Sequence, residues 1–254
     1  MPELSDMTLR AFELPSPPRL NLLTTALFLD LDGTLTGLRP TPAEVTAHPE
    51  RSRLLERLQG WLGGRLAVLS GRSIDDVDRI LEGTVRCVAG VHGLERRDQY
   101  GLRVDFAPHA GLQKADAVLQ ALAAAQAGLL LERKGAALAL HYRGHPPSRE
   151  ACLDAALRLA DAHGLVVREG KMVVELCTPG PNKGDALSTY MADQAFAGAT
   201  PVMVGDDFTD ESAFAAADAA GGFGVLVGEP RETNARYGLA NPAAVRNWLW
   251  TSLA

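Results

Sequence analysis

Cysteines, long apolar runs and an excess of basic residues are all missing or scarce in this sequence. Only three cysteines occur in 254 residues, and none belongs to a C-x-x-C pair. Such a sparse, odd-numbered set excludes a disulfide framework, and because Cys87 and Cys177 lie in apolar runs we expect small buried thiols. No stretch reaches the ~18 apolar residues of a membrane-spanning helix, so we expect no membrane partner.

Basic residues are outnumbered by acidic ones, with 25 Lys and Arg against 31 Asp and Glu and a net charge of -6. This balance argues against a nucleic-acid partner, which would need a basic face or tail. Anionic small molecules remain open, because a local group of cations can override the net charge. Residues 1–20 carry Pro15, Pro17 and Pro18 and lack a basic region followed by an apolar one. We therefore expect an exposed lead-in, no secretory signal and a cytoplasmic protein.

Short apolar runs alternate with segments of helical spacing in the first and last thirds of the chain. The expected strands are 26–31, 66–69, 85–89, 201–205 and 222–227, and the expected helices are 49–62, 74–81, 184–194 and 211–217. Asn241 and Pro242 are suited to cap and open a last helix. This alternation predicts an α/β fold with a doubly wound, Rossmann-like parallel sheet.

The pattern changes between Gly101 and Pro179. A helix, two strands, a helix and two strands are expected at 112–127, 129–133, 137–143, 148–163, 165–169 and 172–177. This order indicates a small α+β unit inserted into the larger one. We predict a discontinuous core domain of residues 1–102 and 180–254, and a second domain of residues 103–179.

Two acids, Asp30 and Asp32, end the first expected strand in the sequence Asp-Leu-Asp-Gly-Thr. Residues i and i+2 of a strand point the same way, so both carboxylates should meet where open α/β sheets bind ligands. Two carboxylates this close repel each other, unless a cation lies between them or one is protonated. The alternative is an ordinary Asp-Gly turn.

Two further motifs offer groups that suit a phosphate. Ser70 and Gly71 end the second expected strand, where a hydroxyl and free N–H groups could hold phosphate oxygens. The alternative is that Ser70 caps the helix beginning near Ser73. Lys183 opens a helix, where a cation is electrostatically unfavourable, which suggests that it neutralises an anion. Taken alone, Lys183 would be interpreted as an ordinary solvated lysine.

An acidic loop follows the strand at 201–205. Asp206, Asp207 and Asp210 place three acids within five residues. Oxygen ligands of this kind suit Mg²⁺, which keeps several waters and takes few protein carboxylates. The alternative is an acidic surface loop in which Asp210 caps the next helix.

These four motifs, in this order, resemble those of the haloacid dehalogenase superfamily of phosphatases. The resemblance implies that Asp30 is the nucleophile and forms a phospho-aspartate, and that Asp32 is the general acid and base. The phosphoryl group would be held by Ser70, Gly71 and Lys183, and Lys183 also counts as catalytic. Mg²⁺ would be bound by Asp30, Asp32 through its carbonyl and Asp206, with Asp207 and Asp210 behind them.

Several segments further resemble the trehalose-phosphate phosphatases of that superfamily. They are His92-Gly93-Leu94-Glu95, Glu132-x-Lys134, His141-Tyr142-Arg143 and the run from Gly170 to Glu175. This resemblance implies hydrolysis of trehalose 6-phosphate, with residues 103–179 as a cap that determines substrate specificity. A disaccharide needs many hydrogen-bonding partners, and the expected sugar contacts are Glu132, Lys134, Glu175, Arg143, His141 and His92.

Three alternatives remain open. The protein could be another sugar phosphatase of the superfamily, acting on sucrose phosphate or mannosyl-phosphoglycerate. It could be a signalling protein that accepts a phosphoryl group, although such receivers lack an insert of ~75 residues. It could also be an inactive binding protein, against which the intact Asp30, Asp32 and Lys183 count. We expect a monomer whose partner is a small-molecule sugar phosphate.

Overall fold

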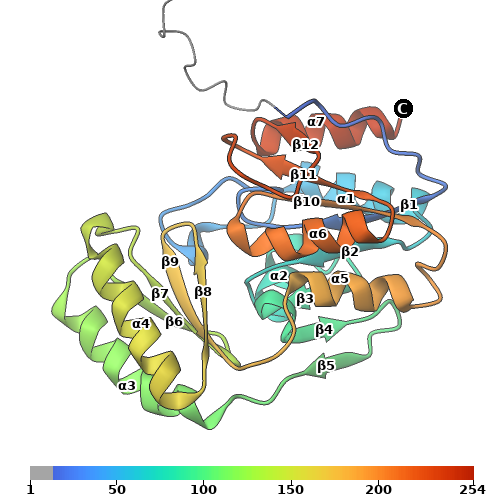
Figure 1. Ribbon diagram of the computed structural model, residues 1–254. Helices are drawn as coiled ribbons and strands as arrows, with labels where there is room; N and C mark the ends of the chain where they lie inside the picture. The colour runs from blue at the N-terminus through green and yellow to red at the C-terminus, as the bar shows by residue number, and fades with distance from the viewer. Residues whose placement is uncertain (1–13) are drawn as a thin grey trace, which may run out of the picture.

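The computed structural model describes residues 14–254, so the part of the lead-in at residues 1–13 lies outside the described residues (Figure 1). The chain contacts the last helix, α7 (Pro242–Ser252), at Pro18 and Leu20. The Trp248 indole donates a hydrogen bond of 2.8 Å to the Pro18 carbonyl, and Leu20 is buried. The expectation of an exposed lead-in is therefore wrong at Pro17 and Leu20, which are buried, although most of residues 14–20 are exposed. Within residues 14–254, no helix is both long and apolar enough to span a bilayer.

An eight-stranded sheet forms the larger layer, in the order β12-β11-β10-β1-β2-β3-β4-β5. Its strands are β1 (Thr25–Leu29), β2 (Leu66–Leu69), β3 (Cys87–Gly90), β4 (Glu95–Arg97), β5 (Arg103–Asp105), β10 (Thr200–Gly205), β11 (Phe223–Val227) and β12 (Tyr237–Leu239). All neighbours pair in parallel except β3 with β4 and β4 with β5. The predicted doubly wound parallel sheet is thus confirmed, with an antiparallel extension at one edge.

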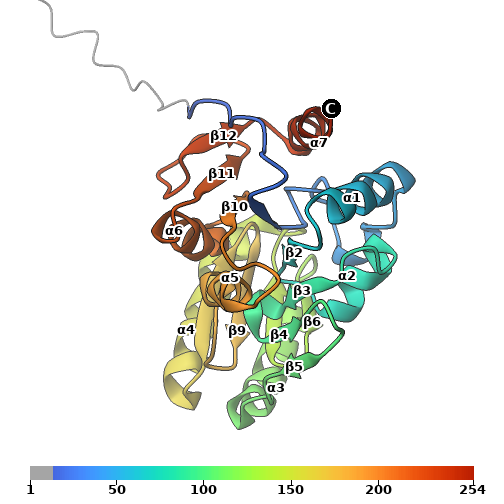
Figure 2. The same cartoon turned by 90° about the vertical axis from the view of Figure 1, so that its right-hand side faces the viewer.

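Helices cover both faces of this sheet. They are α1 (Pro49–Trp61), α2 (Ile74–Leu81) and α7 on one face, and α5 (Lys183–Ala192) and α6 (Glu211–Ala219) on the other (Figure 2). Strand β1 is buried on both sides, because Leu27 and Leu29 pack with the first group while Ala26 and Phe28 pack with the second. Such two-sided burial explains why the parallel strands are continuous apolar runs.

A four-stranded antiparallel sheet forms the smaller layer, in the order β6-β7-β9-β8. Its strands are β6 (Leu130–Arg133), β7 (Ala137–His141), β8 (Val166–Gly170) and β9 (Val173–Cys177), and α3 (Ala110–Ala125) and α4 (Arg149–His163) cover one face. Leu138, Leu140, Val174 and Leu176 pack against these helices. The polar residues of alternate positions therefore occupy the opposite face.

Short elements account for most of what the sequence did not predict. Strands β4, β5 and β12 have only three residues each, and short 3₁₀ turns occupy Pro42–Glu44, Val91–Gly93, Pro146–Ser148 and Phe208–Asp210. Strand β5 pairs with the large sheet, just past the predicted boundary at residue 102. The division into core and cap domains stays a prediction. All three cysteines are free and buried, as expected.

Candidate active site

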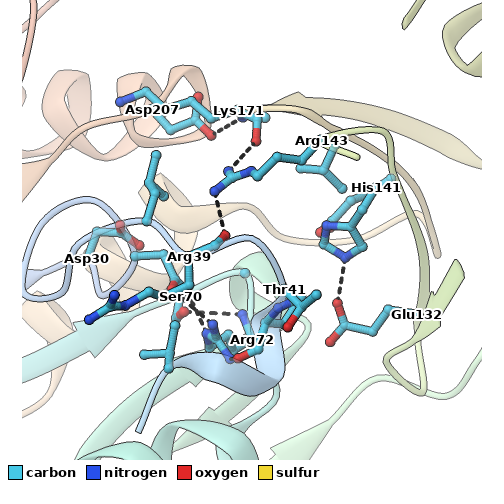
Figure 3. A pocket seen from close by; sticks show the side chains of 18 of the residues that line it. Asp30, Arg39, Thr41, Ser70, Arg72, Glu132, His141, Arg143, Lys171 and Asp207 are labelled. Carbon is cyan, nitrogen blue, oxygen red and sulfur yellow. Dashed lines mark hydrogen bonds and ion pairs between the residues drawn. The ribbon is translucent and has the colours of Figure 1, made fainter. Parts of the chain in front are cut away.

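A cavity lies between the carboxyl ends of the large sheet's central strands and the polar face of the smaller sheet (Figure 3). The predicted site residues that line it are Asp30, Asp32, Ser70, Gly71, His92, Glu132, Lys134, His141, Arg143, Glu175, Asp206 and Asp207. The other two, Lys183 and Asp210, are buried behind this lining. Residues from distant parts of the sequence therefore converge on one cavity.

Asp30 follows β1 and is only 4% exposed. Its Oδ1 accepts a hydrogen bond of 2.7 Å from the Lys183 ammonium. Burial raises the pKa of Asp30 well above its usual value, Lys183 opposes this rise, and the nearby Asp210 and Asp206 add to it. The fold thus holds a buried carboxylate beside two other acids, with the Lys183 ammonium as the described cation that stabilises its charge.

Lys183 is the first residue of α5 and is 2% exposed. Its ammonium donates to Asp30 Oδ1 and to Asp210 Oδ1, each at 2.7 Å. Burial alone would lower the pKa of Lys183, but the charges of Asp210 and Asp30 outweigh it and raise the pKa. The interpretation of Lys183 as a solvated surface lysine is therefore wrong.

Asp206 and Asp210 complete an acidic cluster with Asp30, in which one carboxylate oxygen of each lies within 4.8 Å of the others. Burial, with Asp210 next in importance, raises the pKa of Asp206 to about 6. Gly33 has a φ of +84°, and a Cβ there would come within 2.1 Å of Asp206 Oδ2. Glycine at position 33 therefore leaves room for the Asp206 carboxylate, in addition to forming a turn after β1.

The carboxylate of Asp210 orders the acidic loop. Its Oδ2 accepts hydrogen bonds of 3.0 Å from the backbone N–H groups of Asp206 and Asp207. Asp210 stands at the N-cap position of α6, as the alternative expected, but its side chain makes no capping bond to that helix. With Lys183 on its other oxygen, Asp210 is suited to fix the loop that carries Asp206.

The Asp32 carboxylate contacts Arg72, a residue for which the sequence suggested no function. Arg72 holds the Asp32 carboxylate at both oxygens, with Nε–Oδ2 at 2.6 Å and Nη2–Oδ1 at 3.0 Å. Burial of Arg72 lowers its pKa, but the hydrogen bonds to Asp32 and Asp76 outweigh this and raise it. Such a two-point contact fixes the Asp32 carboxylate in orientation as well as in position.

Ser70 follows β2, is buried and lines the cavity. Its Oγ accepts a hydrogen bond of 3.1 Å from the Arg72 N–H. The residue that caps α2 is Ser73, whose side chain accepts from the Asp76 N–H. Ser70 is therefore not needed for helix capping, and the alternative interpretation of this motif is wrong.

The polar face of the smaller sheet carries a chain of hydrogen bonds. Glu175 is 4% exposed and contacts Lys134 Nζ at 2.7 Å and His92 Nε2 at 2.9 Å. Burial raises its pKa, but the charges and hydrogen bonds of Lys134 and His92 outweigh this and lower it. Nearer the cavity mouth, Glu132 contacts His141 Nε2 at 2.8 Å. The two glutamates share this face because both are paired with Ala139 of β7.

Contacts between the two sheets close the cavity. Lys171, in the turn between β8 and β9, bonds the Asp206 carboxylate through its ammonium and Asp207 Oδ2 through its N–H. Arg143 donates to the carbonyls of Arg39 at 2.7 Å and of Lys171 at 3.0 Å (Figure 3). Nothing in the sequence indicated a function for Arg39, whereas Lys171 belongs to the Gly170–Glu175 segment that resembles the trehalose-phosphate phosphatases.

Comparisons with known proteins agree with this geometry. The family model described as trehalose-phosphatase matches residues 28–243. A probable trehalose-phosphate phosphatase of Sinorhizobium fredii is 39% identical over 81% of this chain and 78% of its own length. The trehalose-6-phosphate phosphatase of Escherichia coli is 38% identical over 88% of this chain and 85% of its own.

A solved structure, the C-terminal domain of Candida albicans trehalose-6-phosphate phosphatase, matches with a TM-score of 0.83 over 94% of this chain and 98% of that one. At 22% identity this likeness shows the fold alone. A haloacid dehalogenase-like hydrolase from Bacteroides thetaiotaomicron also matches, at a TM-score of 0.62. Fold and motifs together place the protein in the haloacid dehalogenase superfamily. Within it, the chain belongs to the trehalose-phosphatase family.

Proposed function

We propose that the protein is a Mg²⁺-dependent phosphatase that hydrolyses trehalose 6-phosphate to trehalose and phosphate through an aspartyl-phosphate intermediate. The observation that carries this proposal is the shape of the site. A single cavity joins the cluster around Asp30 to the polar sheet face around Glu132. One end offers phosphate chemistry and the other offers hydrogen-bonding partners for a sugar. Family membership supports the same pairing of phosphate and disaccharide.

The acidic cluster fits a hard divalent cation. Its donors are carboxylate oxygens only, and Asp30 and Asp206 belong both to the cluster and to the cavity lining. Asp30 and Asp206 would hold Mg²⁺, with the Asp32 carbonyl as a third protein ligand, as the superfamily resemblance implies. When bound, the ion would offset the charge of the phosphate dianion. Asp210 would serve the site indirectly, since Lys183 and two N–H groups already occupy its oxygens.

The chain's own groups then divide the reaction into two displacements. Asp30 Oδ attacks phosphorus while the bond from phosphorus to the sugar oxygen breaks, and Asp32 gives that oxygen its proton. In the second step Asp32 takes a proton from water, which attacks the phospho-aspartate and releases phosphate and free Asp30. Lys183 and Ser70 are placed to hold phosphoryl oxygens, because both are buried beside Asp30. Arg72 would orient the ionised Asp32 carboxylate that takes the proton from water in the second step.

Removal of divalent cations should abolish turnover. We expect a thoroughly chelated sample to retain less than ~1% of its phosphate release, because the ion supplies several kcal/mol of charge stabilisation. Addition of Mg²⁺ in excess of the chelator should restore the rate, and chelator saturated with Mg²⁺ beforehand is the control. Full activity after chelation would contradict the metal site proposed here.

Sugar recognition can be separated from phosphate chemistry at Glu132. This residue lines the cavity and bonds His141, while no residue of the acidic cluster contacts it. We expect Glu132→Ala to lower kcat/KM for trehalose 6-phosphate by roughly 10²-fold, the scale for losing a charge-assisted contact to a hydroxyl. Hydrolysis of p-nitrophenyl phosphate, which has no sugar, should change little. Phosphate release is measured with both substrates.

A matched control is Glu169→Ala, which removes a glutamate that bonds Arg149 of α4 and lies outside the cavity lining. It should leave both activities near normal. Glu175→Ala is expected to lower trehalose 6-phosphate hydrolysis at least as much as Glu132→Ala does. It also removes a hydrogen-bonding partner of the buried Lys134, so its effect is less specific to the sugar. If Glu132→Ala lowers both activities equally, or neither, then Glu132 is not a sugar ligand.

A further inference from the structure

Strand β5 is the outermost strand of the large sheet, next to β4 only (Figure 1). The Phe106 N–H donates to the Leu94 carbonyl, and the Asp98 N–H donates to the Leu102 carbonyl. The peptide groups that face β4 are therefore those of the alternate residues 102, 104 and 106. The peptide groups of Arg103 and Asp105 therefore point away from β4. No other strand among residues 14–254 pairs with them.

The side chains along this edge are unusually apolar for an exposed strand. Leu102, Val104 and Phe106 alternate along it and are 66%, 44% and 42% exposed. Tyr100, two residues earlier, is 84% exposed. Edge strands normally carry bulges, prolines or many charges that prevent pairing with another chain. Here the charges at the edge are one Arg and one Asp, which do not repel each other.

The sequence of this edge is complementary to itself. If the β5 strands of two copies pair antiparallel, their hydrogen bonds must come from the outward peptide groups of residues 103 and 105. Centred on residue 103 or on residue 105, such a pair would oppose Arg to Arg or Asp to Asp. Centred on Val104, it opposes Arg103 to Asp105 twice and makes four backbone hydrogen bonds. The same register sets Leu102 opposite Phe106 and Tyr100 opposite Pro108, so apolar residues meet apolar ones.

We propose that two copies of this chain associate through β5, antiparallel about Val104, and so join their eight-stranded sheets across a two-fold axis. One patch serves both copies, as a two-fold interface requires. The main-chain bonds supply affinity and the Arg–Asp pairs select the register. This association differs from the monomer expected from the sequence, and it does not depend on the proposed enzymatic function.

Sedimentation of the full chain tests the proposal. We expect a concentration-dependent species of twice 27.0 kDa. Arg103→Glu and Asp105→Arg each turn two attractive pairs into repulsive ones, and should raise the dimer dissociation constant by ~10-fold or more. An equimolar mixture of the two variants regains opposite charges at both pairs, so the mixture should dimerise although each variant alone does not. Thermal unfolding of each variant confirms that it is folded.

Val104→Glu is a second variant, because it places two like charges together on the two-fold axis without changing Arg103 or its contacts to Asp75 and Asp105. It should also be monomeric, whereas the control Leu157→Glu, at an exposed apolar position of α4, should dimerise normally. A wild-type chain that stays monomeric up to about 1 mM, the weak end of protein association, overturns the proposal. So do dimers that persist in the variants, or a mixture that remains monomeric.

Discussion

Asp30→Asn is expected to lower kcat by about 10⁴-fold or more, because an amide cannot act as the nucleophile while its shape still fills the site. The same change should not destabilise the fold. Burial raises the pKa of Asp30, so the folded state disfavours the charged carboxylate at neutral pH, and a neutral amide does not meet that penalty. Lys183 also keeps its second partner, Asp210. Phosphate release and thermal unfolding are measured on the same sample.

Acid quenching during turnover gives an independent readout of the same prediction. Wild-type protein should show a phosphoryl adduct on the peptide that contains Asp30, and Asp30→Asn should show none. An exposed acid far from the cavity, Asp154 on α4, supplies the control variant Asp154→Asn, which should behave as wild type. Near-normal turnover in Asp30→Asn would rule out an aspartyl-phosphate intermediate.

Lys183→Met is expected to damage both activity and stability. Its ammonium is the only described cation that contacts both Asp30 and Asp210, which are themselves buried. Removing one partner of a buried ion pair leaves uncompensated charge and costs about 3–5 kcal/mol of unfolding free energy. Loss of the charge beside the phosphoryl group should also lower kcat by ~10³-fold. Urea unfolding and phosphate release measure the two effects separately.

Lys171→Met is the matched lysine control. Lys171 also contacts an acid of the cluster, Asp206, but its side chain is 41% exposed. Water can solvate much of its charge, so its loss should cost about 1 kcal/mol or less. A Lys183→Met protein as stable as Lys171→Met would show that the buried pairs with Asp30 and Asp210 contribute little to the fold.

The core of the site could be predicted from the sequence because the fold itself brings strand ends together. Asp30, Ser70 and Asp206 each follow a parallel strand, and the carboxyl ends of parallel strands lie at one edge of a sheet. The positions of these motifs at strand ends therefore predicted that the three residues lie close together, whatever the conformation of the loops. Lys183 was predictable only together with the other three motifs, because a cation at a helix start is unfavourable but can equally be solvated.

Long side chains that cross between segments could not be predicted in this way. Arg72 reaches Asp32 from the next strand end, and Arg143 reaches the Arg39 carbonyl from the smaller sheet. Their contacts depend on rotamers and on how the two sheets are placed, which no local pattern encodes. The pairing of Glu132 and Glu175 with Ala139 needed the register of three strands, and a one-residue slip would have turned either glutamate to the other face.

The most direct test of the proposed function is a substrate comparison with purified protein and Mg²⁺. Phosphate release is measured for trehalose 6-phosphate, sucrose 6-phosphate, mannosyl-3-phosphoglycerate and glucose 6-phosphate at matched concentrations. We predict that kcat/KM for trehalose 6-phosphate exceeds that for each of the others by ~10²-fold or more, because polar groups of the smaller sheet are left unpaired when the wrong sugar binds. Equal or faster hydrolysis of another sugar phosphate, or no hydrolysis of any, would contradict the proposal.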